Sequence, residues 1–127
     1  MFVVKVPGIN SFGKTKGCEN SGNEILNELK NIPMNEQGKI IDVSLLDLEE
    51  IHLDNSNLEL TNNLIYKNSL EMFETKPKTI FLGGDHSISY SLIKAFYEYA
   101  RNSEKEPCLI VFDSHPNCVQ SKDVKFP

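Results

Sequence analysis

Residues 79–87 read TIFLGGDHS, an apolar run that passes directly into a polar turn. Residues 108–117 repeat the pattern, because the apolar run CLIVF is followed by DSHPN. Both apolar runs are typical of strands buried in a parallel sheet. Ligands of open α/β sheets bind just beyond the carboxyl ends of such strands. The two stretches therefore predict one functional site that contains two histidines and a carboxylate, His86, Asp113 and His115.

The rest of the chain alternates between strand and helix patterns. We expect strands at residues 2–6, 39–45, 79–82 and 108–112, and helices at about 23–31, at 56–74 and from Ser87 onward. Ser56 or Asn57 is suited to cap the second helix. The connections are long enough for parallel crossovers, so residues 1–127 are expected to form one α/β domain. Its predicted architecture is a three-layer α-β-α sandwich with a mainly parallel sheet.

Composition restricts the possible classes of protein. The formal net charge of -5 argues against a nucleic-acid-binding surface, which needs clustered Lys and Arg. No apolar run has the length of a membrane span, and the first seven residues are too short for a signal peptide, so a cytoplasmic protein is expected. The three cysteines have no CxxC spacing and are expected to be reduced, with Cys118 a bystander near the site.

The residue types of the two stretches favour a divalent metal. Imidazole and carboxylate together suit zinc, manganese or iron, and carboxylate-rich sites favour manganese. Residues 113, 115 and 117 would point the same way in an extended chain, and Gly83-Gly84 permits a sharp turn that aims His86 inward. The alternative is an ordinary loop histidine followed by common turn residues. His52 has no such surroundings and is expected at the surface.

A second motif competes with the metal hypothesis. Residues 8–15, GINSFGKT, fit the phosphate-binding pattern G-x-x-x-x-G-K-[ST] and follow a predicted strand. A phosphate-binding loop needs a helix that begins at Lys14-Thr15, so that its amino end faces the phosphates. Residues 16–22 contain two glycines and several capping residues instead. A chance match is therefore favoured over a nucleotide-binding protein.

The two strand-end stretches together resemble the arginase/agmatinase ureohydrolase family, whose signatures are GGDHS and, one strand later, D-A-H-x-D. The Gly-rich residues 8–20 are also similar to the family's loop before its first helix. The resemblance implies a manganese enzyme that hydrolyses a guanidino compound, of arginine or agmatine type, to urea and an amine. It implies that His86 binds one Mn²⁺, that Asp113 bridges two ions, and that His115 binds the second. Such a pair lowers the pKa of a shared water, and the resulting hydroxide attacks the guanidinium carbon.

The chain also departs from the family pattern. Asn117 stands where the family has an aspartate, and an amide is a weaker ligand because it carries no charge. The family's later S-x-D-x-D-x-x-D-P segment is absent from residues 1–127, so the chain looks like the amino-terminal half of the domain. We therefore expect activity to require a complementing chain or self-association at an exposed sheet edge, with a homo-oligomer favoured. The alternative is a non-catalytic remnant or interaction module.

Overall fold

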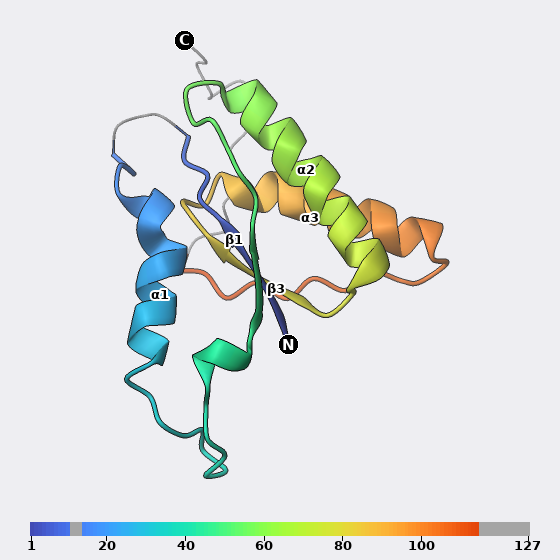
Figure 1. The fold of residues 1–127 in the computed structure, drawn as a ribbon. Helices are drawn as coiled ribbons and strands as arrows, with labels where there is room; N and C mark the ends of the chain where they lie inside the picture. The colour runs from blue at the N-terminus through green and yellow to red at the C-terminus, as the bar shows by residue number, and fades with distance from the viewer. Residues whose placement is uncertain (11–13, 115–127) are drawn as a thin grey trace.

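A three-stranded parallel sheet forms the centre of the computed structural model, which describes residues 1–10 and 14–114 (Figure 1). The strand order is β2-β1-β3, with β1 at Phe2–Val6, β2 at Asp47–Glu50 and β3 at Thr79–Gly83. Three helices accompany the sheet, α1 (Ser21–Leu29), α2 (Leu58–Thr75) and α3 (Ile88–Asn102). Over these ranges, no helix combines the length and apolar character needed to cross a membrane.

β1 lies in the middle of the sheet and is buried on both faces. It pairs in parallel with β2, starting at Phe2 opposite Asp47, and with β3 as far as Val6 opposite Gly83. Val4 and Val6 have no exposed surface. The side chains of alternate β1 residues join one buried cluster with residues of α2, α3 and the chain after β2: Phe2, Val4, Val6, Ile51, Ile65 and Ile88. This continuous apolar strand is the element on which the sheet is built.

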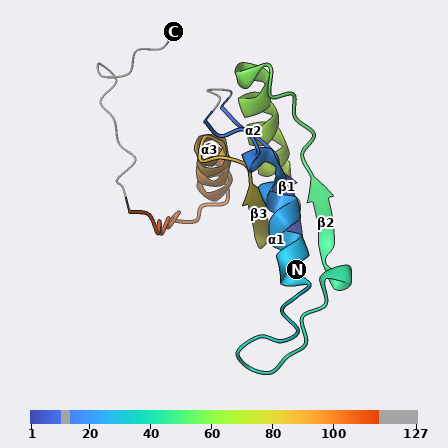
Figure 2. The ribbon, with the colours of Figure 1, turned by 90° about the vertical axis from the view of Figure 1, so that its left-hand side faces the viewer.

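Helices cover both faces of the sheet, as Figure 2 shows from the α1 side. On the α1 face, Lys5 of β1 reaches across to α1, where its Nζ donates a hydrogen bond to Asn23 Oδ1 at 2.8 Å. Gly22 packs against the stem of the same lysine. α2 and α3 lie together on the opposite face and bury Ile65 and Ile88 against β1. The expected three-layer α-β-α sandwich with a parallel sheet is confirmed.

α2 and α3 pack against each other along small and apolar side chains. The buried residues of α2 recur every fourth position, as Thr61, Ile65, Ser69 and Phe73. Phe73 ends this row in an aromatic cluster, with its ring centroid 5.4 Å from that of Phe81 and 5.8 Å from that of Phe96. Asn57 caps the start of α2, because its Oδ1 accepts the Leu60 N–H at 3.0 Å. The three expected helices are confirmed, with ends shifted by one or two residues.

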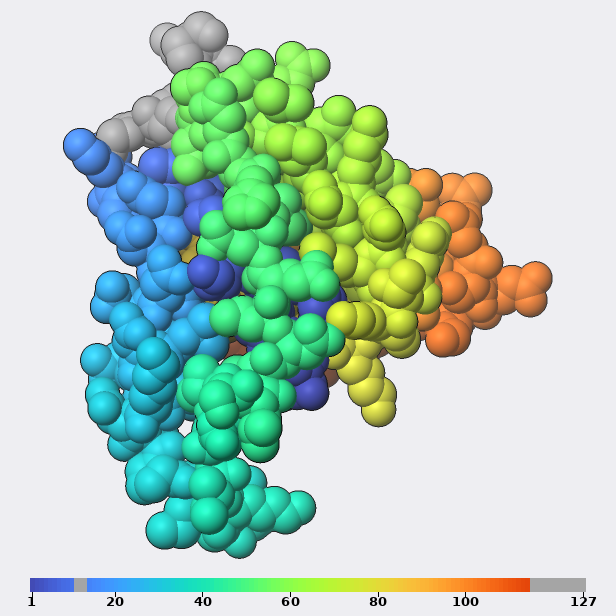
Figure 3. Space-filling model, in the orientation of Figure 1, coloured from blue at the N-terminus to red at the C-terminus, as the bar shows by residue number. Residues whose placement is uncertain are grey.

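The second strand differs from the expectation. Residues 39–45 do not form it, because Asp42 Oδ1 accepts the Ser44 N–H at 2.9 Å and starts a short 3-10 helix, Val43–Leu45. Such local side-chain bonds compete with strand pairing. The strand beside β1 is the acidic β2, which lies in the extended chain that crosses the front of the molecule in Figure 3. Its exposed edge position tolerates acidic side chains that an apolar pattern does not reveal.

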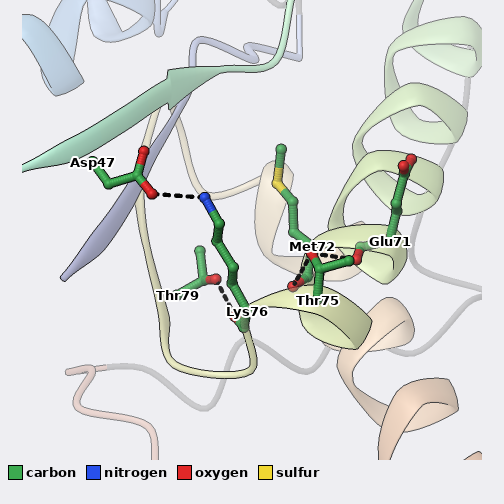
Figure 4. A network of polar contacts seen from close by, with 6 residues as sticks. All are labelled: Asp47, Glu71, Met72, Thr75, Lys76 and Thr79. Carbon is green, nitrogen blue, oxygen red and sulfur yellow. Dashed lines mark hydrogen bonds and ion pairs between the residues drawn. The ribbon is translucent and has the colours of Figure 1, made fainter.

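Two lysines hold this acidic edge strand in place. Lys5 Nζ lies 2.6 Å from Glu50 Oε2. Lys76 follows α2 and extends its Nζ to within 2.6 Å of Asp47 Oδ2, as Figure 4 shows. The Thr79 hydroxyl donates to the Lys76 carbonyl at 2.6 Å, which ties the start of β3 to the same corner. The ion pairs thus add to the backbone pairing with β1 that holds β2 in the sheet.

The expected strand at residues 108–112 is wrong. This apolar segment has no strand partner among the described residues, and its last four side chains are 55%, 72%, 60% and 96% exposed, in the order Leu109, Ile110, Val111 and Phe112. Figure 2 shows the chain here beyond the β3 side of the sheet. A strand needs a neighbouring edge for its backbone hydrogen bonds, and residues 108–112 do not pair with the outer edge of β3, which no described strand occupies.

Candidate metal centre

The turn after β3, residues 83–87, is fixed by direct backbone contact with the loop after β1, residues 7–10. The Gly84 N–H donates to Val6 O at 2.9 Å, and the Asp85 N–H donates to Gly8 O at 3.0 Å. A Cβ atom on Gly84 would lie 1.8 Å from Gly8 O, a distance that no side chain tolerates. The sharp turn expected at Gly83-Gly84 is therefore confirmed, but the turn does not aim His86 inward, because 59% of its side chain is exposed. The turn places His86 at the carboxyl end of the sheet.

The His86 ring, in the turn before α3, contacts a residue in the first turn of that helix. Its Nδ1 lies 2.9 Å from Ser89 Oγ. In the tautomer that carries the ring proton on Nδ1, this nitrogen donates to Ser89 and leaves a free lone pair on Nε2. Metal-binding histidines commonly have their second nitrogen held in this way. Nε2 is also the nitrogen that faces Asp113, at 3.7 Å from Oδ2.

The contact between His86 and Asp113 joins the two stretches that the sequence singled out. Two atoms that each lie about 2.0–2.2 Å from one ion are roughly 3–4 Å apart, so the 3.7 Å separation fits two ligands of a single metal. The same separation also fits a direct ion pair with a protonated histidine. The side chain of His86 is 59% exposed, and an ion pair this open to solvent contributes little stability.

The described residues supply only part of a metal site. Within residues 1–10 and 14–114, no three His, Cys, Asp or Glu side chains come together in a group that could hold an ion. The other two expected ligands, His115 and Asn117, lie outside the described residues. The donor types of His86 and Asp113 fit a divalent cation such as Mn²⁺, and their number requires further ligands.

Asp85 is a residue of this site that the sequence reasoning did not assign. It is 9% exposed, and its two carboxylate oxygens bind different segments. Oδ2 accepts the Asn10 N–H at 2.9 Å, while Oδ1 accepts the Ser87 N–H at 2.9 Å and the Ser87 hydroxyl. Burial raises the pKa of Asp85, but the hydrogen bonds from Ser87, Asn10 and Thr15 outweigh it and leave the pKa below its usual value. The carboxylate is therefore ionised at neutral pH.

Asn55 fixes the loop after β1 from the other side. Its Nδ2 donates to Pro7 O at 2.9 Å, and its Oδ1 accepts the Ile9 N–H at 3.1 Å. The spacing Asp-x-Ser could have indicated Asp85, since it often marks a side-chain-closed turn. No pattern in the sequence distinguishes Asn55 from the other asparagines of this chain.

The phosphate-binding hypothesis fails on geometry. No helix begins at Lys14 or Thr15, because Gly17 adopts a left-handed φ of 103° and α1 starts only at Ser21. The phosphates would therefore face no helix amino end there. His52 is at the surface as expected, with 91% of its side chain exposed. Cys18 and Cys108 are free thiols, and Cys118 lies outside the described residues.

Comparison with known proteins gives one result. The model of the arginase family matches residues 1–126. No curated protein and no solved structure matches the chain significantly. The family match covers nearly the whole chain, including the turn with His86, the segment with Asp113 and the loop after β1.

Proposed function

The chain belongs to the arginase family, and from that premise we propose that it acts as a manganese-dependent ureohydrolase on a guanidino compound of arginine or agmatine type. The observation that carries the proposal is the 3.7 Å separation of His86 Nε2 and Asp113 Oδ2. The family membership supports a ureohydrolase-like protein in general terms. The metal, the substrate and catalysis are the parts that we propose.

The roles of the residues follow from their contacts. His86 offers the Nε2 lone pair, and Ser89 holds the ring in the orientation that keeps this atom directed at Asp113. Asp113 contributes the negative charge that a divalent ion requires. A bound Mn²⁺ pair would supply a hydroxide at neutral pH for attack on the guanidinium carbon. We assign His115, and more weakly Asn117, as further ligands by their place in the family motif.

The four proposed ligands carry too little negative charge for two divalent ions, so further carboxylates are needed. Among the four proposed ligands only Asp113 is anionic, and one negative charge balances two divalent ions poorly. We therefore propose that activity depends on carboxylates from a complementing chain or from a second copy of this chain. The exposed apolar segment at residues 108–112 favours such an association, because large apolar patches mark interaction sites.

One observation favours a second candidate function, a non-catalytic member of the family. Asn117 replaces the aspartate of the family motif and so removes one of the charges that would hold the ions. Such a protein would keep the α/β fold and bind a partner without hydrolysing a guanidino compound. Metal binding and urea release together separate the two candidates.

The test measures Mn²⁺ binding by calorimetry and urea release from arginine and agmatine, for the chain alone and mixed with a candidate complementing chain. We expect His86→Ala to weaken Mn²⁺ binding by at least about 10-fold, because a ligand matters no less than the groups that orient it. His52→Ala is the matched control, since this exposed histidine lies away from the site. Unchanged Mn²⁺ affinity in His86→Ala would contradict the metal site, and bound Mn²⁺ without urea under any condition would favour the non-catalytic candidate.

A further inference from the structure

We propose that Asp85 is a positioning residue of the metal centre, which locks the turn that carries His86 to the loop after β1 and so fixes where the imidazole lies. The inference rests on the proposed metal-binding function. It assigns to Asp85 an indirect role, because both of its oxygens are engaged by other groups of the chain. Its effect on a metal is exerted through the adjacent His86.

The two carboxylate oxygens of Asp85 bind different segments of the chain. Oδ1 closes the turn around His86 by accepting both the N–H and the hydroxyl of Ser87. Oδ2 accepts the Asn10 N–H at 2.9 Å, across a sequence separation of 75 residues. One nearly buried side chain therefore joins two loops that the chain order keeps far apart. A buried carboxylate is tolerated only when it is hydrogen-bonded in this way.

Two other Asp-x-Ser turns in this molecule show what the turn needs in order to form. Asp42 accepts the N–H and the hydroxyl of Ser44 at 2.9 and 2.6 Å, and Asp54 does the same with Ser56 at 3.0 and 2.6 Å. Both of these aspartates are exposed. An Asp-x-Ser turn thus forms in this protein without burial and without a long-range bond. The bond from Asp85 to Asn10 is an addition that turn formation does not require.

The hydrogen bond between Asn10 and Asp85 lies directly beside His86, whose side chain has few other contacts that fix its position. The His86 side chain is 59% exposed, so packing alone does not fix its position. Its backbone lies between Asp85 and Ser87, the two residues that the carboxylate connects. The Thr15 hydroxyl lies 3.4 Å from Asn10 Oδ1 and donates toward it, so it contacts the same loop residue whose N–H bonds to Asp85. Loss of these bonds would leave the turn held to the loop after β1 only by the backbone bonds of the two residues that precede His86.

Asp85→Asn tests the long-range bond selectively. The amide keeps one oxygen that can accept from Ser87, but its NH₂ group replaces the oxygen that faces the Asn10 N–H, and two donors cannot bond. Asp42→Asn is the matched control, because it makes the same chemical change in a turn of the same type at an exposed position. Two readouts are needed: Mn²⁺ affinity by calorimetry and hydrogen exchange of the Asn10 amide by NMR.

We expect Asp85→Asn to bind Mn²⁺ about 10- to 100-fold more weakly, the usual effect of removing a group that orients a ligand. Exchange of the Asn10 amide should be faster, and Asp42→Asn should change neither quantity. A purely structural role would lower the unfolding temperature of the metal-free chain and leave Mn²⁺ affinity unchanged. A folded Asp85→Asn variant with Mn²⁺ affinity within about twofold of the wild type would overturn the proposal.

A second variant keeps the test decisive if Asp85→Asn does not fold. Asn10→Pro removes the backbone N–H that donates to Asp85 Oδ2 and leaves the Asp85 carboxylate in place. Weaker Mn²⁺ binding in this variant supports the proposal, and unchanged binding contradicts it. If the wild-type chain binds no Mn²⁺, alone or mixed with the complementing chain, the proposed metal function fails, whereas unchanged Asn10 exchange in Asp85→Asn shows separately that the proposed bond between the two loops is wrong.

Discussion

The two strand-end stretches look alike in sequence, yet the structure holds them in opposite ways. The turn after β3 is tied to the loop after β1 by backbone bonds from Gly84 and Asp85 and by the Asp85 side chain. The apolar segment at residues 108–112 has no strand partner in the described part of the chain, and Phe112 is 96% exposed. An apolar run alone thus does not make a strand, since residues 108–112 stay unpaired although no described strand occupies the outer edge of β3.

The largest effect expected from this difference is on stability. Gly84→Ala should lower the free energy of unfolding by about 3 kcal/mol, because the new Cβ would overlap Gly8 O and force the two loops apart. Ile110→Ala removes a larger group but should change stability by no more than about 0.5 kcal/mol, because Ile110 is 72% exposed. Urea denaturation followed by circular dichroism measures both.

Two outcomes of these stability measurements would contradict the difference between the turn after β3 and residues 108–112. Equal losses of stability in Gly84→Ala and Ile110→Ala would mean that residues 108–112 are packed in solution. A small loss in Gly84→Ala alone would mean that the loop after β1 moves aside at little cost.

A smaller effect is expected on self-association. Four exposed apolar side chains from each of two copies, together with the open edge of β3, approach the roughly 1,000 Å² that a specific interface needs. Exchange of the apolar segments between two copies would let each segment pair with the open edge of β3 in the other copy. We expect the chain to form dimers or larger oligomers, and Ile110→Lys to weaken association by about 10-fold, the effect of losing about 1.4 kcal/mol of binding free energy.

Light scattering over a range of protein concentrations measures this association. Ile40→Lys is the control, because Ile40 is 82% exposed but lies away from β3 and the apolar segment. A wild-type chain that stays monomeric at all concentrations would contradict the expectation. So would an equal effect of the two lysine substitutions.

Much of the fold could be predicted from the sequence because its decisive signals are local. The apolar run of β1, the Asn57 cap of α2 and the periodic face of α3 depend on neighbouring residues and are confirmed. β2 could not be predicted, because its acidic residues are stabilised by Lys5 and Lys76 from other elements. The strand expected at residues 108–112 failed because strand pairing depends on contacts outside the segment, which its apolar pattern does not report.

The proximity of two of the proposed donors could be predicted, but the contacts that support them could not. The sequence placed His86 and Asp113 at the ends of two neighbouring strands, and the side chains lie 3.7 Å apart although residues 108–112 form no strand. Asp85 belongs to the same motif as His86, but the motif does not indicate its role, because its partner Asn10 is 75 residues away. Such long-range bonds are a property of the folded chain. His115 and Asn117 stay predictions, since they lie outside the described residues.

The central claim is that Mn²⁺ binds between His86 and Asp113, and paramagnetic line broadening tests it most directly. In an NMR titration with substoichiometric Mn²⁺, the account predicts that the ring signals of His86 and the amide of Asp113 broaden first, while the exposed His52 stays sharp. The acidic strand β2 is the competing place for a cation, because it carries Asp47, Glu49 and Glu50. Broadening that begins at β2, or that affects His52 and His86 equally, would contradict the account.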